Sequence, residues 1–246
     1  MENRNFKLDT EWNMIHYPKK PKGFGVLILG DERHFVDEKS SFWIQNEGKF
    51  AIINKLRDEG YTIFYSNLYG KNWGSEKAVH LAKRLYEYMI RTEIINSKIH
   101  IIAEGMGSLV AIKLLSEMEE KIRSLVLINP ILSLKHHLEQ EKERKFFYKK
   151  LINEISFSYG KETKQMVELI SQSIDAPTNL KPDIPTKIIH VLAGNRAYKQ
   201  SNLLKQLSVQ WETEEAPINI CYMLPEKKQQ IGQQVIKFFN AHEKIL

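Results

Sequence analysis

The chain has 246 residues, of which 42% are hydrophobic and one is a cysteine, and its formal net charge is +6. This length suits one α/β domain with a sizeable core, and a lone cysteine excludes an internal disulfide, which favours a reducing cytoplasm. No apolar run reaches the roughly 20 residues of a membrane span, and the modest charge, without a recognisable motif, argues against nucleic-acid binding. We therefore expect one cytoplasmic domain over residues 1–246, with no transmembrane segment, nucleic-acid partner, metal or cofactor.

The first third of the chain predicts strands and helices in alternation. Short alternating stretches from 6 to 17 indicate one or two edge strands, and the glycine-bounded apolar run 25–30 is typical of a strand buried on both faces. A helix is expected over 47–59, followed by a strand over 61–65 and a long helix over 76–93.

The rest of the chain repeats this alternation around one insertion. Strands are expected over 99–103, 124–130, 186–194 and 218–223, with a helix from the turn after 103 to Met118 and a closing helix over 229–242. This order predicts a three-layer α/β/α sandwich around a doubly wound, mostly parallel sheet of about seven or eight strands.

The insertion between two of these strands covers residues 133–182 and has a helical pattern. A charged helix is expected over 135–154, with Phe146 and Phe147 among its apolar contacts, and a second helix over 161–173. Lysines and arginines alternate with glutamates in the first helix, which favours a solvated face, while a membrane or an acidic partner is the alternative.

The stretch 99–111 passes from an apolar strand through small residues into a helix. It resembles the nucleophile elbow of the α/β-hydrolase family, which reads G-x-S-x-G. In this register Ala103 takes the first glycine, Gly107 takes the last, and Gly105 takes the place of the serine. Glycine has no side chain to form an acyl-enzyme, so the resemblance implies an elbow without its nucleophile.

The same resemblance implies where the acid, the base and the oxyanion loop should lie, and it implies a helical cap. The acid should follow the strand that ends at Gly194, where Ala197 stands, and the base should lie in the loop 222–230, which has no histidine. Gly30 and Asp31 take the place of the oxyanion loop, where a carboxylate repels negative charge unless it caps a turn or faces solvent. The insertion 133–182 corresponds to the helical cap of the family.

Because the expected nucleophile, acid and base are missing, three hypotheses about function remain open. The first is a non-catalytic α/β-hydrolase-like protein, a pseudoenzyme, that binds a small molecule or a protein partner in or over the cleft beneath the cap. The second is a serine hydrolase of ester or thioester bonds with rearranged groups. The third is an interaction module that uses the basic cap and the loop 19–22 at an acidic surface.

The candidate residues differ between the hypotheses, and the sequence leaves the ligand, the partner and the oligomeric state open. A rearranged hydrolase needs a displaced serine, Ser108 or Ser66, together with His136 or His137. Candidate residues of the binding cleft are Gly30, Asp31, Tyr69, Trp73, Gly105 and Met106.

Overall fold

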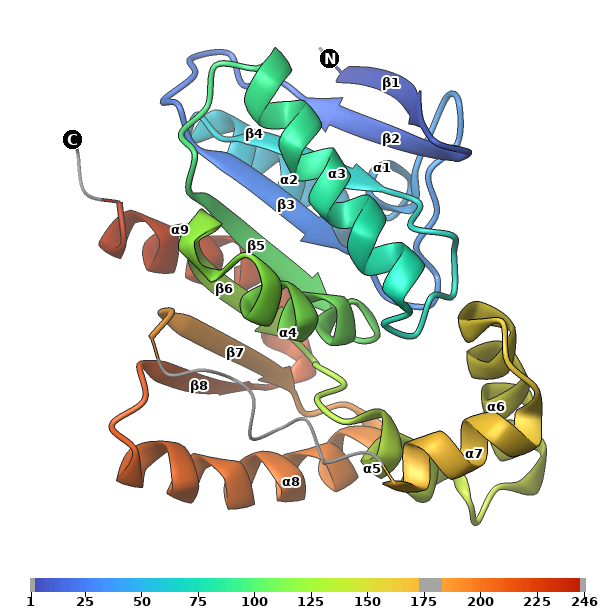
Figure 1. The fold of residues 1–246 in the computed structure, drawn as a ribbon. Helices are drawn as coiled ribbons and strands as arrows, with labels where there is room; N and C mark the ends of the chain where they lie inside the picture. Colours follow the sequence, from blue (N-terminus) through green and yellow to red (C-terminus); the bar gives the residue numbers. More distant parts are fainter. Residues whose placement is uncertain (1–2, 173–182, 244–246) are drawn as a thin grey trace.

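The computed structural model describes residues 3–172 and 183–243 as an eight-stranded sheet with helices on both faces (Figure 1). The strand order is β1-β2-β4-β3-β5-β6-β7-β8. β2 is antiparallel to β1 and β4, whereas the other neighbours are parallel, which confirms the predicted mostly parallel sheet. The strands are β1 (Asn3–Leu8), β2 (Glu11–His16), β3 (Gly25–Leu29), β4 (Thr62–Ser66), β5 (Ile99–Glu104), β6 (Ile122–Ile128), β7 (Thr186–Val191) and β8 (Ile218–Met223).

Two apolar layers hold the helices against the sheet. Successive residues of a strand point to opposite faces, so Leu27 packs in one layer and Ile28 in the other. Because both faces are covered, β3, β4 and nearly all of β5 and β6 are buried, as their continuous apolar runs predict. One face carries α3 (Glu76–Thr92), α4 (Gly107–Glu117) and α8 (Gly194–Thr213), and the other carries α1 (Phe42–Gln45), α2 (Glu47–Asp58) and α9 (Ile231–Ala241).

Among the described residues between β6 and β7, within the predicted insertion, there are three helices, which we call the cap helices. They are α5 (Leu134–Glu141), α6 (Lys145–Tyr159) and α7 (Thr163–Gln172). They share an apolar cluster with the start of α4, in which Ile155 and Met166 contribute from the cap. Residues 173–182, which include the predicted end of the insertion, lie outside the described residues.

The prediction of one helix over 135–154 was wrong in two respects. The chain breaks between α5 and α6, where residues 142–144 are all charged and supply no apolar side chain for packing. Phe146 and Phe147 were expected to make apolar contacts, but they are 76% and 47% exposed. They lie in the first turn of α6, and the buried stripe of this helix begins only at Leu151.

Helix α8 was not predicted, although the sequence carries a signal for it. Leu204, Leu207 and Trp211 repeat at intervals of three and four residues, and all three are buried against the sheet. This stripe is short for a helix of 20 residues, and polar residues occupy most other positions. The helix begins directly after β7 and contains Ala197, so it fixes where the position expected for a catalytic acid lies.

A close approach between α4 and β3 positions the turn that precedes α4. A Cβ atom added to Gly107 would lie 2.4 Å from the Leu29 carbonyl oxygen and 2.8 Å from that of Gly30. Backbone atoms in a packed sheet cannot move aside cheaply. Glycine at position 107 therefore sets how closely the start of α4 approaches the end of β3.

We expect the Gly107→Ala variant to lose about 2–3 kcal/mol of unfolding free energy, because the added methyl group overpacks against the backbone of β3. Urea unfolding followed by circular dichroism measures this loss. Gly48→Ala, in the exposed first turn of α2, is the control, and it should change stability by less than about 1 kcal/mol. Equal effects of the two substitutions would contradict the close approach.

Candidate functional site

The turn between β5 and α4 has the backbone of an elbow, and a glycine stands at its centre. Gly105 has φ of +50°, a left-handed conformation that costs other residues energy. Its N–H donates to the Ile128 carbonyl (3.0 Å), and its own carbonyl accepts from the Ile131 N–H (3.0 Å). Both backbone groups of Gly105 are therefore fixed by the chain that leaves β6.

The carboxylate of Asp31 occupies the space in front of this turn. The Met106 N–H donates to Asp31 Oδ1 at 2.9 Å. A Cβ atom added to Gly105 would lie 2.0 Å from the same oxygen, so a side chain at position 105 needs Asp31 to move. Asp31 therefore faces the elbow.

This hydrogen bond matters because of the role of the same N–H in a working elbow. The N–H after the nucleophile is one of the two donors that stabilise the oxyanion. Here the Met106 N–H already serves a carboxylate, and a second negative charge beside it would be repelled. While Asp31 keeps this position, the Met106 N–H is not available to an oxyanion.

The two positions at which the resemblance predicts an acid and a base carry neither group. Ala197, at the acid position, is 7% exposed in α8, and its carbonyl accepts from His190 Nε2 at 2.8 Å. Burial lowers the pKa of His190, which keeps this ring neutral. The turn after β8, Pro225–Gln230, contains no histidine.

The serines that a rearranged mechanism needs are enclosed. Ser108 and Ser66 have no exposed surface, and the Ser66 hydroxyl accepts from the Leu68 N–H at 3.2 Å. His136 lies 2.8 Å from the Gln140 amide, and His137 stacks on Trp73 with ring centroids 5.7 Å apart. These groups are parts of the packed interior and of α5.

The predicted cleft beneath the cap is filled by side chains at the elbow. Met106 and Trp73 are each 1% exposed, in the apolar cluster formed with the cap helices. Gly30 packs against His34, whose ring a Cβ atom at position 30 would overlap. Tyr69 is half-buried against the layer of α3 and α4. Of the six candidate residues, only Asp31 lines the cavity described next.

This cavity, of about 870 Å³, opens beside Asp31 on the side of the sheet that carries α2 and α9. It lies at the carboxyl ends of β3, β5, β6 and β7, the edge at which parallel sheets bind ligands. Its size falls within the range of small-molecule sites. Residues that line it and bear charge or a polar group include Asp31, Lys49, Lys55, Glu104, Asn129 and Lys228.

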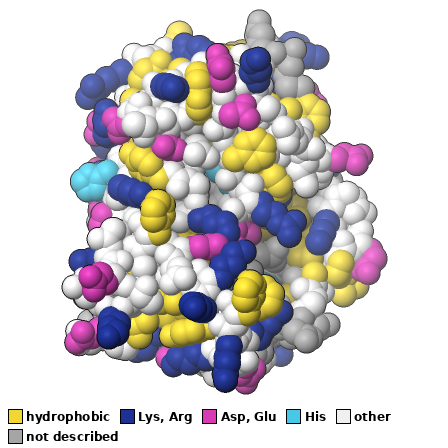
Figure 2. Space-filling view, turned by 90° about the vertical axis from the view of Figure 1, so that its right-hand side faces the viewer, with side chains coloured by type: hydrophobic (Ala, Val, Ile, Leu, Met, Phe, Trp, Pro, Cys, Tyr) yellow, Lys and Arg dark blue, Asp and Glu magenta, His cyan; other side chains and the backbone are white. Residues whose placement is uncertain are grey.

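Some of the charged side chains in this carboxyl-edge cavity form an ion pair, and others do not. Lys49 Nζ lies 2.5 Å from Glu104 Oε1, which joins α2 to the end of β5 and neutralises both groups. Asp31 has no ion-pair partner among the residues that the structure describes. Lys55 and Lys228 also line the cavity and are exposed, and Lys55 Nζ donates to the Gln229 carbonyl at 3.4 Å. Figure 2 looks onto this edge and shows Lys and Arg side chains gathered with Asp and Glu around the middle of the face.

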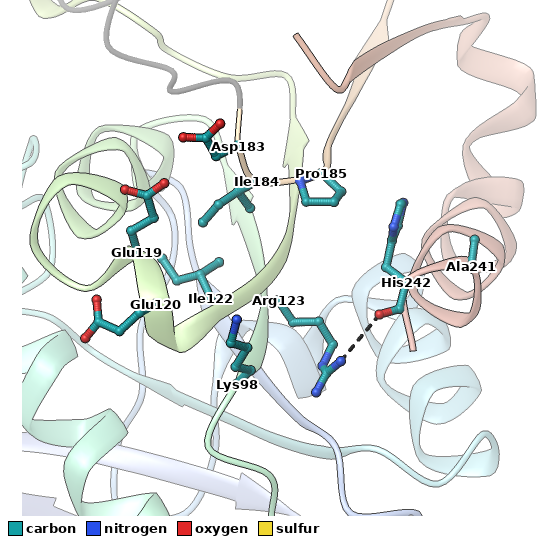
Figure 3. A pocket seen from close by; sticks show the side chains of 10 residues that line it. All are labelled: Lys98, Glu119, Glu120, Ile122, Arg123, Asp183, Ile184, Pro185, Ala241 and His242. Carbon is teal, nitrogen blue, oxygen red and sulfur yellow. Dashed lines mark hydrogen bonds between the residues drawn. The ribbon is translucent and has the colours of Figure 1, made fainter. Parts of the chain in front are cut away.

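A second cavity, of about 630 Å³, lies at the opposite edge of the sheet (Figure 3). Lys98 and Arg123 face it together with acidic residues, and Arg123 donates to the His242 carbonyl at 3.5 Å. It lies at the amino ends of β5, β6 and β7, far from the elbow. The cavity beside Asp31 is therefore the candidate site.

The sequence alone did not reveal that the Lys49–Glu104 pair, Lys55 and Lys228 line one cavity, because these side chains come from segments far apart in the chain. In residues 3–172 and 183–243, no cluster of three or more His, Cys, Asp or Glu side chains is placed to hold a metal ion. Within the same ranges, none of the helices combines the length and the apolar character needed to cross a membrane.

Comparisons with known proteins give relatives in structure alone. No family model and no curated protein sequence matches the chain. Est1E from Butyrivibrio proteoclasticus has a TM-score of 0.64 and 11% identity over 98% of both chains. An esterase from Pyrococcus furiosus has a TM-score of 0.63 and 13% identity, over 99% of this chain and 92% of its own. An α/β-hydrolase enzyme from a lagoon-sediment metagenome, with 12% identity, aligns at a TM-score of 0.58 over 97% of this chain and 98% of its own. The protein has the fold of the α/β-hydrolases.

Proposed function

We propose that this protein is a non-catalytic member of the α/β-hydrolase fold that binds a small molecule in the carboxyl-edge cavity. The observation that carries the proposal is the position of Asp31, whose carboxylate takes the Met106 N–H and fills the space beside Gly105. An elbow in this state has neither a nucleophile nor a free donor for an oxyanion.

Two further observations support the loss of catalysis. The acid position holds Ala197, and the turn after β8 has no histidine, so proton transfer has no group at either corner. Ser108 and Ser66 are fully buried, which keeps both hydroxyls away from any substrate. A rearranged serine hydrolase would require the elbow, the cap or both to open.

The charges of the cavity favour a ligand with both signs of charge. Asp31 offers a carboxylate without a cationic partner, which suits an ammonium group. Lys55 and Lys228, which also line the cavity, suit a carboxylate or another anionic group. We therefore infer that the ligand is a small zwitterion, with its ammonium group at Asp31 and its anionic group towards the two lysines.

The first test concerns catalysis. The purified protein should not hydrolyse p-nitrophenyl esters or thioesters, and a fluorophosphonate probe should not label it, because the candidate nucleophiles Ser108 and Ser66 are fully buried. An active serine esterase is the positive control. Turnover or labelling that disappears in Ser108→Ala or Ser66→Ala would sink the proposal.

The second test concerns the contact between Asp31 and the elbow. Gly105→Ala should cost about 2–3 kcal/mol, since the added methyl group strains a left-handed backbone and displaces Asp31 from the Met106 N–H. In the Asp31→Ala background the same substitution should cost only about 1 kcal/mol. A double-mutant cycle by urea unfolding measures this difference, and additive effects would show that Asp31 does not occupy the elbow.

The third test concerns the ligand. A panel of amino acids, simple amines and simple carboxylates is screened by thermal shift, and the compounds that bind are measured by calorimetry. Asp31→Asn should weaken the binding of zwitterions and amines about tenfold or more. Lys228→Gln should weaken zwitterions but not simple amines.

The matched control for this test is Asp183→Asn, which removes a carboxylate from the cavity at the opposite edge of the sheet. It should leave binding unchanged. If no member of the panel binds, or if Asp183→Asn and Asp31→Asn have equal effects, the proposed ligand class is wrong.

A further inference from the structure

Three phenylalanines are exposed along one helix of the cap. Phe146, Phe147 and Phe157 of α6 are 76%, 47% and 84% exposed. Single exposed apolar residues are common on protein surfaces, but a cluster of large ones marks an interaction site. Packing within this chain therefore does not explain why a helix of 15 residues carries three exposed aromatic side chains.

The outward side of α6 also carries lysines. Phe146 and Phe157 are separated by close to three helical turns, so they lie on one stripe about 16 Å long. Lys149 and Lys150 lie between them and are exposed, and Lys145 lies at the start of the helix. We call this surface the α6 face; it consists of Lys145, Phe146, Phe147, Lys149, Lys150 and Phe157.

The α6 face has no free carboxylate to balance its lysines. The one acidic residue of α6, Glu154, is half-buried and pairs with Lys71 at 2.6 Å and with Lys150 at 4.0 Å. Lys145 and Lys149 have no ion-pair partner within the described part of the chain. Lys77, from α3, lies 5.9 Å from the Phe157 ring and extends the positive charge to that end of the helix.

We propose that the α6 face binds the surface of an anionic lipid bilayer. Helices that lie in the headgroup layer combine aromatic side chains, which enter the boundary of the acyl chains, with lysines that attract anionic headgroups. The α6 face has both components on one side, while Leu151, Ile152 and Ile155 on the other side anchor it to the protein.

The form of the α6 face favours a bilayer over a protein partner. Its aromatic side chains stand out from a convex helix, and lysines separate the two most exposed ones. A bilayer accepts such separate side chains without a matching pocket, whereas a protein would need one pocket for each. The proposal does not depend on the ligand of the carboxyl-edge cavity.

The experiment is flotation of the intact protein with vesicles, either of phosphatidylcholine alone or with about 30% phosphatidylserine. We expect binding to the anionic vesicles, weaker by about tenfold or more on neutral vesicles and reduced by salt. Phe146→Ser/Phe157→Ser should lower the partition coefficient about tenfold, and Lys145→Gln/Lys149→Gln should lower it and weaken the dependence on salt.

Two control variants separate this surface from others. Ile94→Ser removes an apolar side chain that is 98% exposed at another site, and Lys19→Gln/Lys20→Gln removes two charges from the basic loop near the N-terminus. Both should bind as the wild type does. Circular dichroism confirms that every variant is folded.

Several outcomes would overturn the proposal: no binding to anionic vesicles, wild-type binding by the phenylalanine variant, or an equal loss in the Lys19/Lys20 variant. Binding to an acidic protein without binding to vesicles would also overturn it, and would assign the α6 face to a protein partner.

Discussion

The arrangement of the site depends on how closely the turn at Gly105 approaches the end of β3. Because Gly107 has no side chain, the start of α4 rests on the carbonyl groups of Leu29 and Gly30. This contact brings the Met106 N–H within hydrogen-bond distance of the side chain at position 31, two residues after the end of β3. The same backbone geometry can serve an oxyanion or a carboxylate, and the residue at position 31 decides which.

The region between the cap and the elbow is apolar and filled, whereas the carboxyl-edge cavity beside the elbow is open and charged. On the cap side, Met106 and Trp73 lie in an apolar cluster that leaves little space above the turn. On the side of α2 and α9, the turn after β8 brings Lys228 instead of a histidine to the edge of the sheet. The open space and its charged side chains therefore lie on the side of α2 and α9, away from the cap.

Much of the fold follows from local patterns in the sequence. The strands of the sheet are short apolar runs, and Gly105 and Gly107 mark the elbow, so these features need no knowledge of distant contacts. Phe146 and Phe147 on the outer face of α6 were predicted to pack, because apolar residues alone do not reveal which face of a helix is buried. Helix α8 was missed although Leu204, Leu207 and Trp211 mark its buried stripe.

The candidate site was harder to predict than the fold. The sequence left two alternatives for Asp31, since its partner at Met106 is 75 residues away, and the Lys49–Glu104 pair joins residues 55 apart. Such contacts depend on how strands and helices pack, which no local pattern encodes. The expected positions of a triad could be inspected one by one in the sequence, whereas the carboxyl-edge cavity could be found only in three dimensions.

The mutual exclusion of Asp31 and a side chain at position 105 also shapes the mutations open to this chain. A serine at position 105 alone would meet the Asp31 carboxylate, and a smaller residue at position 31 alone would free an N–H beside an elbow that has no nucleophile. The contact between the Asp31 carboxylate and the elbow therefore couples positions 31 and 105, so that a substitution at one of them changes what the other can accept.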